Sequence, residues 1–422
     1  MPDPIPEQLR RWLERAIRDG ASDLHLISGY PPCLRVHGNL TELRDSVFAA
    51  ADAESLLAPI CPPGALDRLR THKNVDFSFD LPRADGSVRF RVCLFMAGGE
   101  LAACLRVVPP AIPPFEWAGF PMELAERLAF LRDGLVIVTG PTGSGKTTSL
   151  AMIVNLLNQT GGYRIITVEE PVEYVFPRAL NSVVTQREVG VDVLTFADGL
   201  KYGLRQDPDV ILVGEIRDRE TAQMALSAAE TGHLVFATLH TRDTKGAITR
   251  YPDLFPQDSQ GIVRSQLAMG LRAVVSQRLL PGADRGGKRH LALEVLFNTH
   301  PVASAIRTGK VESLDMYLVT GRADGMISFD ESVRQLLAAG KITRTVAGEP
   351  MRNGTSRRKI CCTLAYAAFR VARSGLERPS SNAASISAFL YLAKLKDDVE
   401  CSTGYAVGSG SAANPATNPA AV

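Results

Sequence analysis

Apolar residues recur at helical spacing near the start of the chain. Over residues 7–18 they fall on one face of a predicted helix, at Leu9, Trp12, Leu13, Ala16 and Ile17. The Asp-Gly pair at 19–20 ends this helix. Strand-like runs follow, separated by turn signals at 29–32 and 85–86, and they lie at residues 23–27, 33–36, 75–79, 89–92 and 102–108. Residues 1–108 are therefore predicted to form a small α+β domain.

A proline-rich segment separates this domain from a different pattern. Residues 109–114 read Pro-Pro-Ala-Ile-Pro-Pro, which suits neither a helix nor an inner strand, so we place a linker at 109–123. Over residues 124–348 apolar strands alternate with helices, and the strands are predicted at 135–138, 164–168, 210–213 and 234–238. This alternation is typical of an α/β fold with a mostly parallel sheet. Each strand ends at a polar motif, where such sheets bind their ligands.

The pattern changes again over residues 349–422. The first part is basic, with Arg352, Arg357, Arg358, Lys359, Arg370, Arg373 and Arg378, and a Ser- and Ala-rich stretch follows. We predict that this divergent tail is partly disordered. Two interpretations stay open: a functional tail, and an extension without a role.

The composition of the chain excludes several classes of protein. The 422 residues are 45% hydrophobic and 22% charged, as in a globular protein, and the net charge of +2 gives no general attraction to nucleic acid. The seven cysteines form no Cys-x-x-Cys pair, which argues against a zinc module of the usual spacing. No apolar run approaches the roughly 18 residues of a membrane span. We expect a cytoplasmic protein that acts at a membrane only as a peripheral partner.

The strongest chemical signal is a phosphate-binding loop. Residues 140–147 read Gly-Pro-Thr-Gly-Ser-Gly-Lys-Thr, between a predicted strand and a predicted helix over 148–157. Glycines let backbone N–H groups surround phosphates, and the helix N-terminus adds positive potential. Lys146 would neutralise the β- and γ-phosphates of ATP, and the Thr147 hydroxyl would bind Mg²⁺. The predicted nucleotide-binding residues here are Gly140, Pro141, Thr142, Gly143, Ser144, Gly145, Lys146, Thr147 and Thr148.

Polar residues stand at the ends of the neighbouring strands. Glu215 follows the apolar run 210–213 after one glycine, where a carboxylate can hold the Mg²⁺ hydration shell or polarise the attacking water. Glu169 and Glu170 follow the strand at 164–168. His233 and His240 flank the strand at 234–238, and each is either a sensor of the γ-phosphate or an ordinary packing residue.

Four motifs in this order resemble those of the type II/IV secretion ATPases. They are Gly-Pro-Thr-Gly-Ser-Gly-Lys, Ile-Thr-Val-Glu-Glu-Pro-Val-Glu, the stretch from Leu204 to Asp218, and Ala-Glu-Thr-Gly-His-Leu-Val-Phe-Ala-Thr-Leu-His. They look like the Walker A, Asp box, Walker B and His box of that family, and most like its twitching-motility, PilT-type branch. The resemblance covers roughly residues 5–345. It implies a homohexamer of RecA-like ATPase domains, each preceded by a PAS-like domain, that acts on an inner-membrane platform protein of the pilus.

The resemblance also implies roles for single residues. Lys146 and Thr147 bind nucleotide and Mg²⁺, and Glu215 is the Walker B acid and catalytic base. Glu169 and Glu170 form the Asp box, and His233 and His240 the His box. Arg205 and Arg217 match arginines near the phosphates. Arg91 matches one that reaches nucleotide from the N-terminal domain, which we expect a neighbouring subunit of the ring to supply.

The sequence departs from the family pattern at several positions. Glu170 replaces the usual Asp of the Asp box, Cys93 replaces an Asn, and Arg242 replaces a small polar residue. Pro252 lies where a helix normally continues and should end it. The Ala-Ile-Arg motif of the retraction branch aligns ambiguously with residues 305–307.

Three alternatives to a pilus-retraction motor stay open. A pilus-extension or type II secretion ATPase usually carries a tetracysteine module, which this chain lacks. A DNA-translocating motor would need a basic stripe with interleaved aromatic residues, which the core does not show. A weakly active auxiliary ring subunit would fit the unusual Asp box, Pro252 and the tail, but not the intact Lys146, Thr147 and Glu215.

Overall fold

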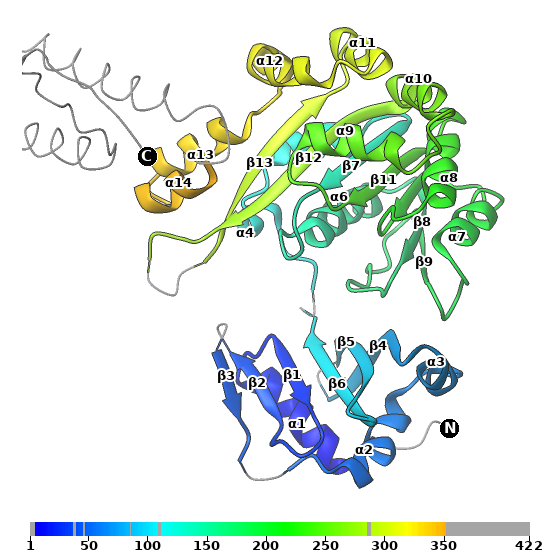
Figure 1. The fold of residues 1–422 in the computed structure, drawn as a ribbon, viewed down its shortest axis with the longest axis vertical. Helices are drawn as coiled ribbons and strands as arrows, with labels where there is room; N and C mark the ends of the chain where they lie inside the picture. Colours follow the sequence, from blue (N-terminus) through cyan, green and yellow to red (C-terminus); the bar gives the residue numbers. More distant parts are fainter. Residues whose placement is uncertain are drawn as a thin grey trace, which may run out of the picture. The chain divides into compact units, whose positions relative to one another are not determined.

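The structure, a computed structural model, describes residues 5–351 except 37–38, 45–46, 85, 109–110 and 285–287 (Figure 1). The predicted turn residue Asp85, the first two residues of the predicted linker and nearly all of the predicted tail lie outside the described residues. The described residues up to Pro350 form one compact unit. Within this unit two sheets are formed, one before and one after the proline-rich segment.

The first sheet has six strands in the order β3-β2-β1-β6-β5-β4, and its paired strands are antiparallel. Its predicted helix and five predicted strands are present, but two strands are much longer than expected because the 75–79 and 89–92 runs extend into one hairpin. The elements are α1 (Glu7–Arg18), β1 (Asp23–Leu26), β2 (Cys33–Val36), β3 (Asn39–Glu42), α2 (Ala50–Leu57), η1 (Ala58–Ile60), α3 (Ala65–His72), β4 (Asn74–Arg83), β5 (Gly86–Ala97) and β6 (Glu100–Val107).

One face of this sheet packs on its helices, and the other carries two polar rows. Leu24, Leu34, Val92 and Leu105 belong to one buried apolar cluster with the apolar residues of α1. Residues paired across neighbouring strands share a face. On the second face one row runs Cys33, His25, Cys104, Cys93, and the next runs Arg35, Asp23, Arg106, Arg91, Ser78.

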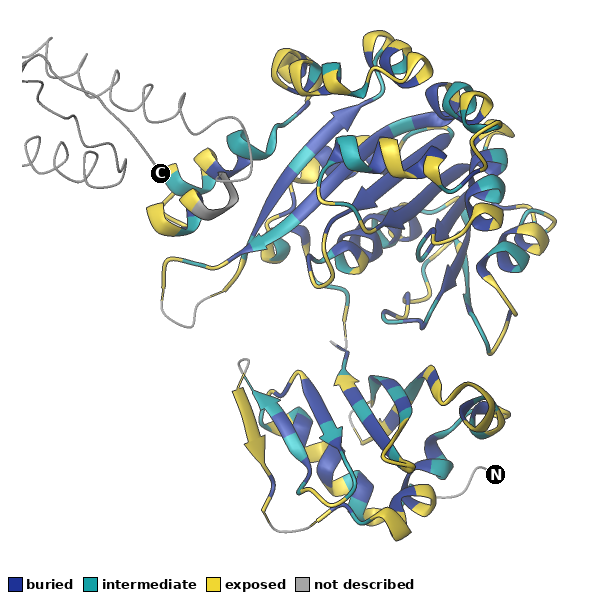
Figure 2. Ribbon diagram, viewed as in Figure 1, coloured by how far each residue is buried: buried dark blue, intermediate teal, exposed yellow. Residues whose placement is uncertain are grey.

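The second sheet has seven strands in the order β13-β12-β7-β11-β10-β8-β9. All of its pairings are parallel except that of β12 with β13, which confirms the predicted mostly parallel α/β fold. Its strands are β7 (Gly134–Thr139), β8 (Arg164–Glu169), β9 (Val183–Glu188), β10 (Val210–Val213), β11 (Leu234–Leu239), β12 (Leu271–Leu280) and β13 (His290–Phe297). Every residue of β7, β10 and β11 is buried, as expected for central strands covered on both faces (Figure 2).

Helices surround this sheet and form a second hydrophobic core with it. They are α4 (Phe115–Ala118), α5 (Met122–Ala129), α6 (Lys146–Thr160), α7 (Phe196–Gly203), α8 (Arg219–Glu230), α9 (Thr244–Asp253), α10 (Gln260–Gly270), α11 (His300–Thr308), η2 (Val311–Ser313), α12 (Leu314–Thr320), η3 (Gly321–Asp324), α13 (Phe329–Ala338) and α14 (Arg344–Met351). Helix α14 crosses the boundary predicted at residues 348 and 349, and its Ala347 is buried. Helix α9 ends one residue after Pro252, as expected of a proline that cannot continue it.

Three further observations concern the described residues. No helix among them is long and apolar enough to cross a membrane. Their four cysteines, Cys33, Cys61, Cys93 and Cys104, are free thiols. In helix α11, which contains the Ala-Ile-Arg stretch, Ala305 and Ile306 are buried while Arg307 is exposed.

Candidate functional site

The loop between β7 and α6 lies close against strand β12. Its glycines 140, 143 and 145 have φ angles of 143°, 76° and 89°, in the region that favours glycine. A Cβ atom at Gly140 would come within 2.3 Å of the Gln277 carbonyl oxygen. The loop therefore requires glycine both for its backbone turn and for its close approach to β12.

Two polar side chains of this loop are buried beneath it. Lys146 is 8% exposed, and its Nζ donates to the carbonyl oxygens of Gly140 at 3.0 Å and Pro141 at 3.3 Å. Burial lowers the pKa of Lys146, while the charges of Glu215 and Glu173 act to raise it. The Ser144 hydroxyl is buried without a hydrogen-bond partner. An ammonium group, an unpartnered hydroxyl and the N-terminus of α6 together fit a bound phosphate chain.

The loop opens into a cavity of about 770 Å³, within the usual size range of ligand sites. Besides the loop, the lining includes Glu169, Glu170, Glu173, Tyr174, Glu215, Arg217 and His240 from the neighbouring strand ends, Trp117, Lys288 and Arg289, and Arg91 and Arg106 from the N-terminal sheet. The carboxyl ends of parallel strands thus gather their polar residues as the sequence predicts.

Glu215 is the centre of a charged cluster at this edge. Its Oε2 lies 3.0 Å from His240 Nε2, and its Oε1 contacts the Arg217 guanidinium. Arg217 Nη1 also donates to Glu170 Oε2 at 2.9 Å. Glu170, which departs from the family pattern, is thereby held by the same arginine as Glu215. The structure brings together all four residues, each predicted for this site.

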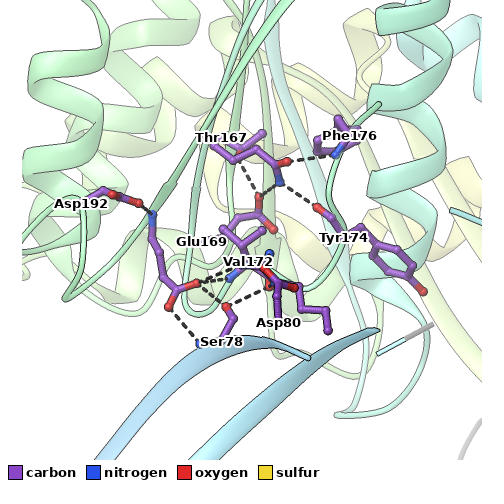
Figure 3. Close-up of polar contacts among 11 residues, drawn as sticks. Ser78, Asp80, Thr167, Glu169, Val172, Tyr174, Phe176 and Asp192 are labelled. Atoms are coloured by element: carbon purple, nitrogen blue, oxygen red, sulfur yellow. Dashed lines mark hydrogen bonds and ion pairs between the residues drawn. The ribbon is translucent and has the colours of Figure 1, made fainter. Parts of the chain in front are cut away.

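Glu169 is buried and held by two neutral donors. The Thr167 hydroxyl donates to its Oε1 at 2.6 Å and Gln186 Nε2 at 3.1 Å (Figure 3). Burial raises the pKa of Glu169 to about 7, against the opposing effect of these two hydrogen bonds. A carboxyl group with a pKa near neutrality suits proton transfer at physiological pH.

Arg91 reaches the cavity from the N-terminal sheet of the same chain. Its Nη1 donates to Glu173 Oε1 at 3.2 Å, and the side chain is about one-third exposed. From the family resemblance we expect a neighbouring subunit to supply this arginine. In the structure Arg91 lines the cavity that the phosphate-binding loop of its own chain opens into, because Ser78 of β4 and Arg89 of β5 contact Val172 in the loop after β8.

Two predicted nucleotide-binding residues lie at the other end of the sheet. His233 precedes β11, and its carbonyl oxygen accepts from Gly134 N–H at the start of β7, whereas the phosphate-binding loop follows the end of β7. Arg205 is exposed after α7, just before the start of β10. Neither residue lines the cavity of its own chain, so their role in nucleotide binding stays a prediction. The sequence motif contains both ends of a buried strand, and only one end faces the cavity.

Comparison with known proteins assigns the chain to a family. The family described as "Type II/IV secretion system protein" matches residues 2–356. The chain belongs to this family.

The sequences of similar proteins align with most of this chain. The type IV pilus retraction ATPase PilT of Pseudomonas aeruginosa is 40% identical over 332 residues, which cover 79% of this chain and 94% of the relative. A twitching motility protein of Neisseria gonorrhoeae is 38% identical over 325 residues, 77% of this chain and 85% of the relative. A crystal structure of the pilus retraction motor PilT with bound ADP is 41% identical, with a TM-score of 0.72 over 83% of this chain and 98% of that one.

Some cavity residues were not predicted. Glu173 stands within the quoted Asp-box motif, so its charge was visible, but pairing with Arg91 depends on the contact between the two sheets. Arg106 lies directly across from Arg91 on β6, and only the strand register reveals this. Among the described residues no three His, Cys, Asp or Glu side chains are grouped so that they could hold a metal ion by themselves.

Proposed function

We propose that the chain is a hexameric motor ATPase that couples ATP hydrolysis to type IV pilus retraction. The carrying observation is the phosphate-binding loop with buried Lys146 and Ser144, facing Glu169 and Glu215 across one cavity. Relatives 38–40% identical over most of the chain are named for pilus retraction and twitching motility. The motifs at the ends of the strands of the second sheet therefore carry the chemistry, and the names of the relatives indicate what ATP hydrolysis is used for.

The chain's own residues would act as follows in ATP hydrolysis. The glycine-rich loop and Lys146 bind the phosphate chain, and the exposed Thr147 and nearby Glu215 would hold Mg²⁺, which neutralises phosphate charge. Glu215 is oriented by Arg217 and His240, so it can align the attacking water. Glu215 would accept the proton from that water as the catalytic base, and Glu169, with its pKa near 7, is a second proton acceptor in the same cavity.

We further propose the arrangement that the resemblance implies. The N-terminal domain is PAS-like, the second domain is RecA-like, and six copies form a ring. Movement of one domain against the other about residues 109–114 would transmit force to a platform protein in the inner membrane, where the ring acts peripherally. In such a ring, Arg205 and His233 could contribute to a nucleotide site only across subunit interfaces. We expect no nucleic acid among the partners of the ring.

The alternative of a weakly active auxiliary subunit is less well supported. It rests on the Asp-box change to Glu170, on Pro252 and on the tail. The Glu170 side chain still reaches Arg217 at 2.9 Å, so the longer carboxylate is accommodated. A pilus-extension or secretion ATPase would share the same nucleotide chemistry and differ in its partner.

An ATPase assay with two variants tests the enzymatic part. Lys146→Ala should lose tight ATP binding, because it removes the fixed countercharge of the β- and γ-phosphates. Glu215→Gln should bind MgATP but hydrolyse it about 10²–10⁴-fold more slowly. Wild-type nucleotide affinity in the first variant, or wild-type kcat in the second, would contradict the assignment.

A cellular assay tests the motor part. In a piliated strain whose own retraction ATPase has been deleted, expression of this chain should restore pilus retraction, and Glu215→Gln should not. Restored pilus assembly in a strain lacking its extension ATPase would instead favour the extension alternative.

A further inference from the structure

The edge strand β9 presents two polar side chains toward the segment that follows β8. Gln186 and Glu188 are two residues apart, so they lie on the same face of the strand. Gln186 binds Glu169, the Tyr174 carbonyl oxygen at 2.7 Å and the Phe176 N–H at 3.0 Å. Glu188 binds the middle of the same segment, at Val172. Within the described sheet, no strand pairs with the segment that follows β8. The side chains of Gln186 and Glu188 on β9 therefore hold this segment in place.

Glu188 also receives donors from the N-terminal sheet. Its carboxylate accepts from the backbone N–H of Val172 and from that of Ser78, each at 3.1 Å, and contacts the Ser78 hydroxyl (Figure 3). The Arg89 guanidinium lies 3.8 Å away as an ion-pair partner. Glu188 is only 6% exposed. A buried carboxylate needs these donors, and they come from both domains.

Val172 is held from the same two sides. Its carbonyl oxygen accepts from Arg89 Nε at 2.8 Å and lies 3.1 Å from the Ser78 hydroxyl. The residue stands between Glu170 and Glu173, both of which line the cavity. Contacts that fix the Val172 backbone therefore also fix the position of these carboxylates.

Ser78 stands directly opposite Arg91 in the β4–β5 pairing. Anchoring Ser78 to Glu188 consequently places Arg91 beside Glu173 and in the cavity lining. We infer that Glu188 is a positioning residue of the nucleotide site: it ties the N-terminal sheet to residues 170–173, and Arg91 acts in the cavity only while this tie holds. The inference rests on the proposed ATPase function for its effect on turnover, but not for the tie itself.

The tie is tested by hydrogen–deuterium exchange on the full chain without nucleotide, which needs no turnover. Glu188→Gln keeps the shape but replaces one acceptor oxygen with an NH₂ group and removes the charge facing Arg89. We expect faster exchange, about tenfold or more, in β4 around Ser78 and in residues 171–175 together. Glu54→Gln is the matched control, because Glu54 forms an exposed ion pair with Arg70 in the same domain and should change neither segment. Should Glu188→Gln not fold, Ser78→Ala removes one donor from the other side and should loosen the same two segments.

The positioning role is tested by combining variants in the ATPase assay. Glu188→Gln should lower kcat about tenfold to a hundredfold while ATP affinity changes little, because the phosphate-binding loop is untouched. If Glu188 acts through Arg91, the double variant with Arg91→Ala should be no slower than Arg91→Ala alone. Unchanged exchange in both segments, or independent effects in the double variant, would overturn the inference. A wild-type chain without ATPase activity would refute the proposed function. The hydrogen–deuterium exchange of the two segments would still show whether Glu188 ties the N-terminal sheet to residues 170–173.

Discussion

Glu169 shows how one buried position sets a chemical property. Its carboxyl group is buried at the end of β8 and accepts hydrogen bonds from two neutral donors, Thr167 and Gln186, so burial disfavours the charged form. The raised pKa has a cost for the folded protein above neutrality, since the carboxylate must then be ionised in an environment that disfavours it.

The raised pKa of Glu169 predicts that the difference in stability between the wild type and Glu169→Gln depends on pH. The pKa of Glu169 rises from 4.5 to about 7 on folding, so the folded chain binds the extra proton between these values and its stability falls as pH increases through that window. The shift corresponds to about 3 kcal/mol. Glu169→Gln stays neutral, so its melting temperature relative to wild type should rise from about pH 5 to about pH 8. A difference that stays constant across this range would show that Glu169 is not titrating there.

Residues that act through local motifs could be predicted, whereas those that act through tertiary contacts could not. Lys146, Glu169, Glu215, Arg217 and His240 stand in or beside recognisable motifs, and the structure gathers all of them at one cavity. Gln186 and Glu188 belong to an ordinary polar strand, and only its position beside β8 gives them partners.

At the scale of elements, hydrophobic pattern predicted the central strands best. The run 210–213 matches β10 at both ends, because four buried apolar residues are bounded by Asp209 and Gly214. Strand β9 was not predicted, since only its last residue is buried and its pattern resembles that of a loop. The predicted start of the tail at residue 349 falls inside α14, which ends at Met351, and the compact unit ends at Pro350.

The position of α14 predicts where the chain can be shortened. A chain that ends after Met351 retains this helix and the whole apolar core described for the second sheet, so ATPase activity and ring formation should be unchanged. A chain that ends after Thr343 also loses α14 with its buried Ala347, and its melting temperature should fall. Equal loss of folding in both would show that residues 352–422 contribute to the core.

At the scale of the whole molecule, the placement of Arg91 makes a prediction about subunit mixing. Lys146→Ala subunits should be inactive and Arg91→Ala subunits strongly slowed, because we propose that Arg91 supplies charge stabilisation of the arginine-finger kind, worth about 10³–10⁵ in rate. If each site takes both residues from one chain, as the contacts here indicate, rings mixed from the two variants should stay inactive. Recovered activity would show that a neighbouring subunit supplies Arg91.

A second prediction concerns the ring itself. If the active form is a hexamer, ATPase activity per subunit should rise with protein concentration as rings assemble, in parallel with the hexamer fraction measured by light scattering. Constant specific activity down to monomeric protein would contradict a ring-dependent motor.

The row of thiols on the N-terminal sheet has a practical consequence. Cys93 and Cys104 lie opposite one another, next to the row that carries Arg91 and Arg106. Burial raises the pKa of Cys93 to about 11 and that of Cys104 above its usual value. Both are thus protonated at neutral pH and slow to react with alkylating reagents. The rate at which a small maleimide alkylates Cys93 and Cys104, followed at each site during turnover, therefore reports how often this face of the sheet is exposed to solvent, and no cysteine has to be introduced for the measurement.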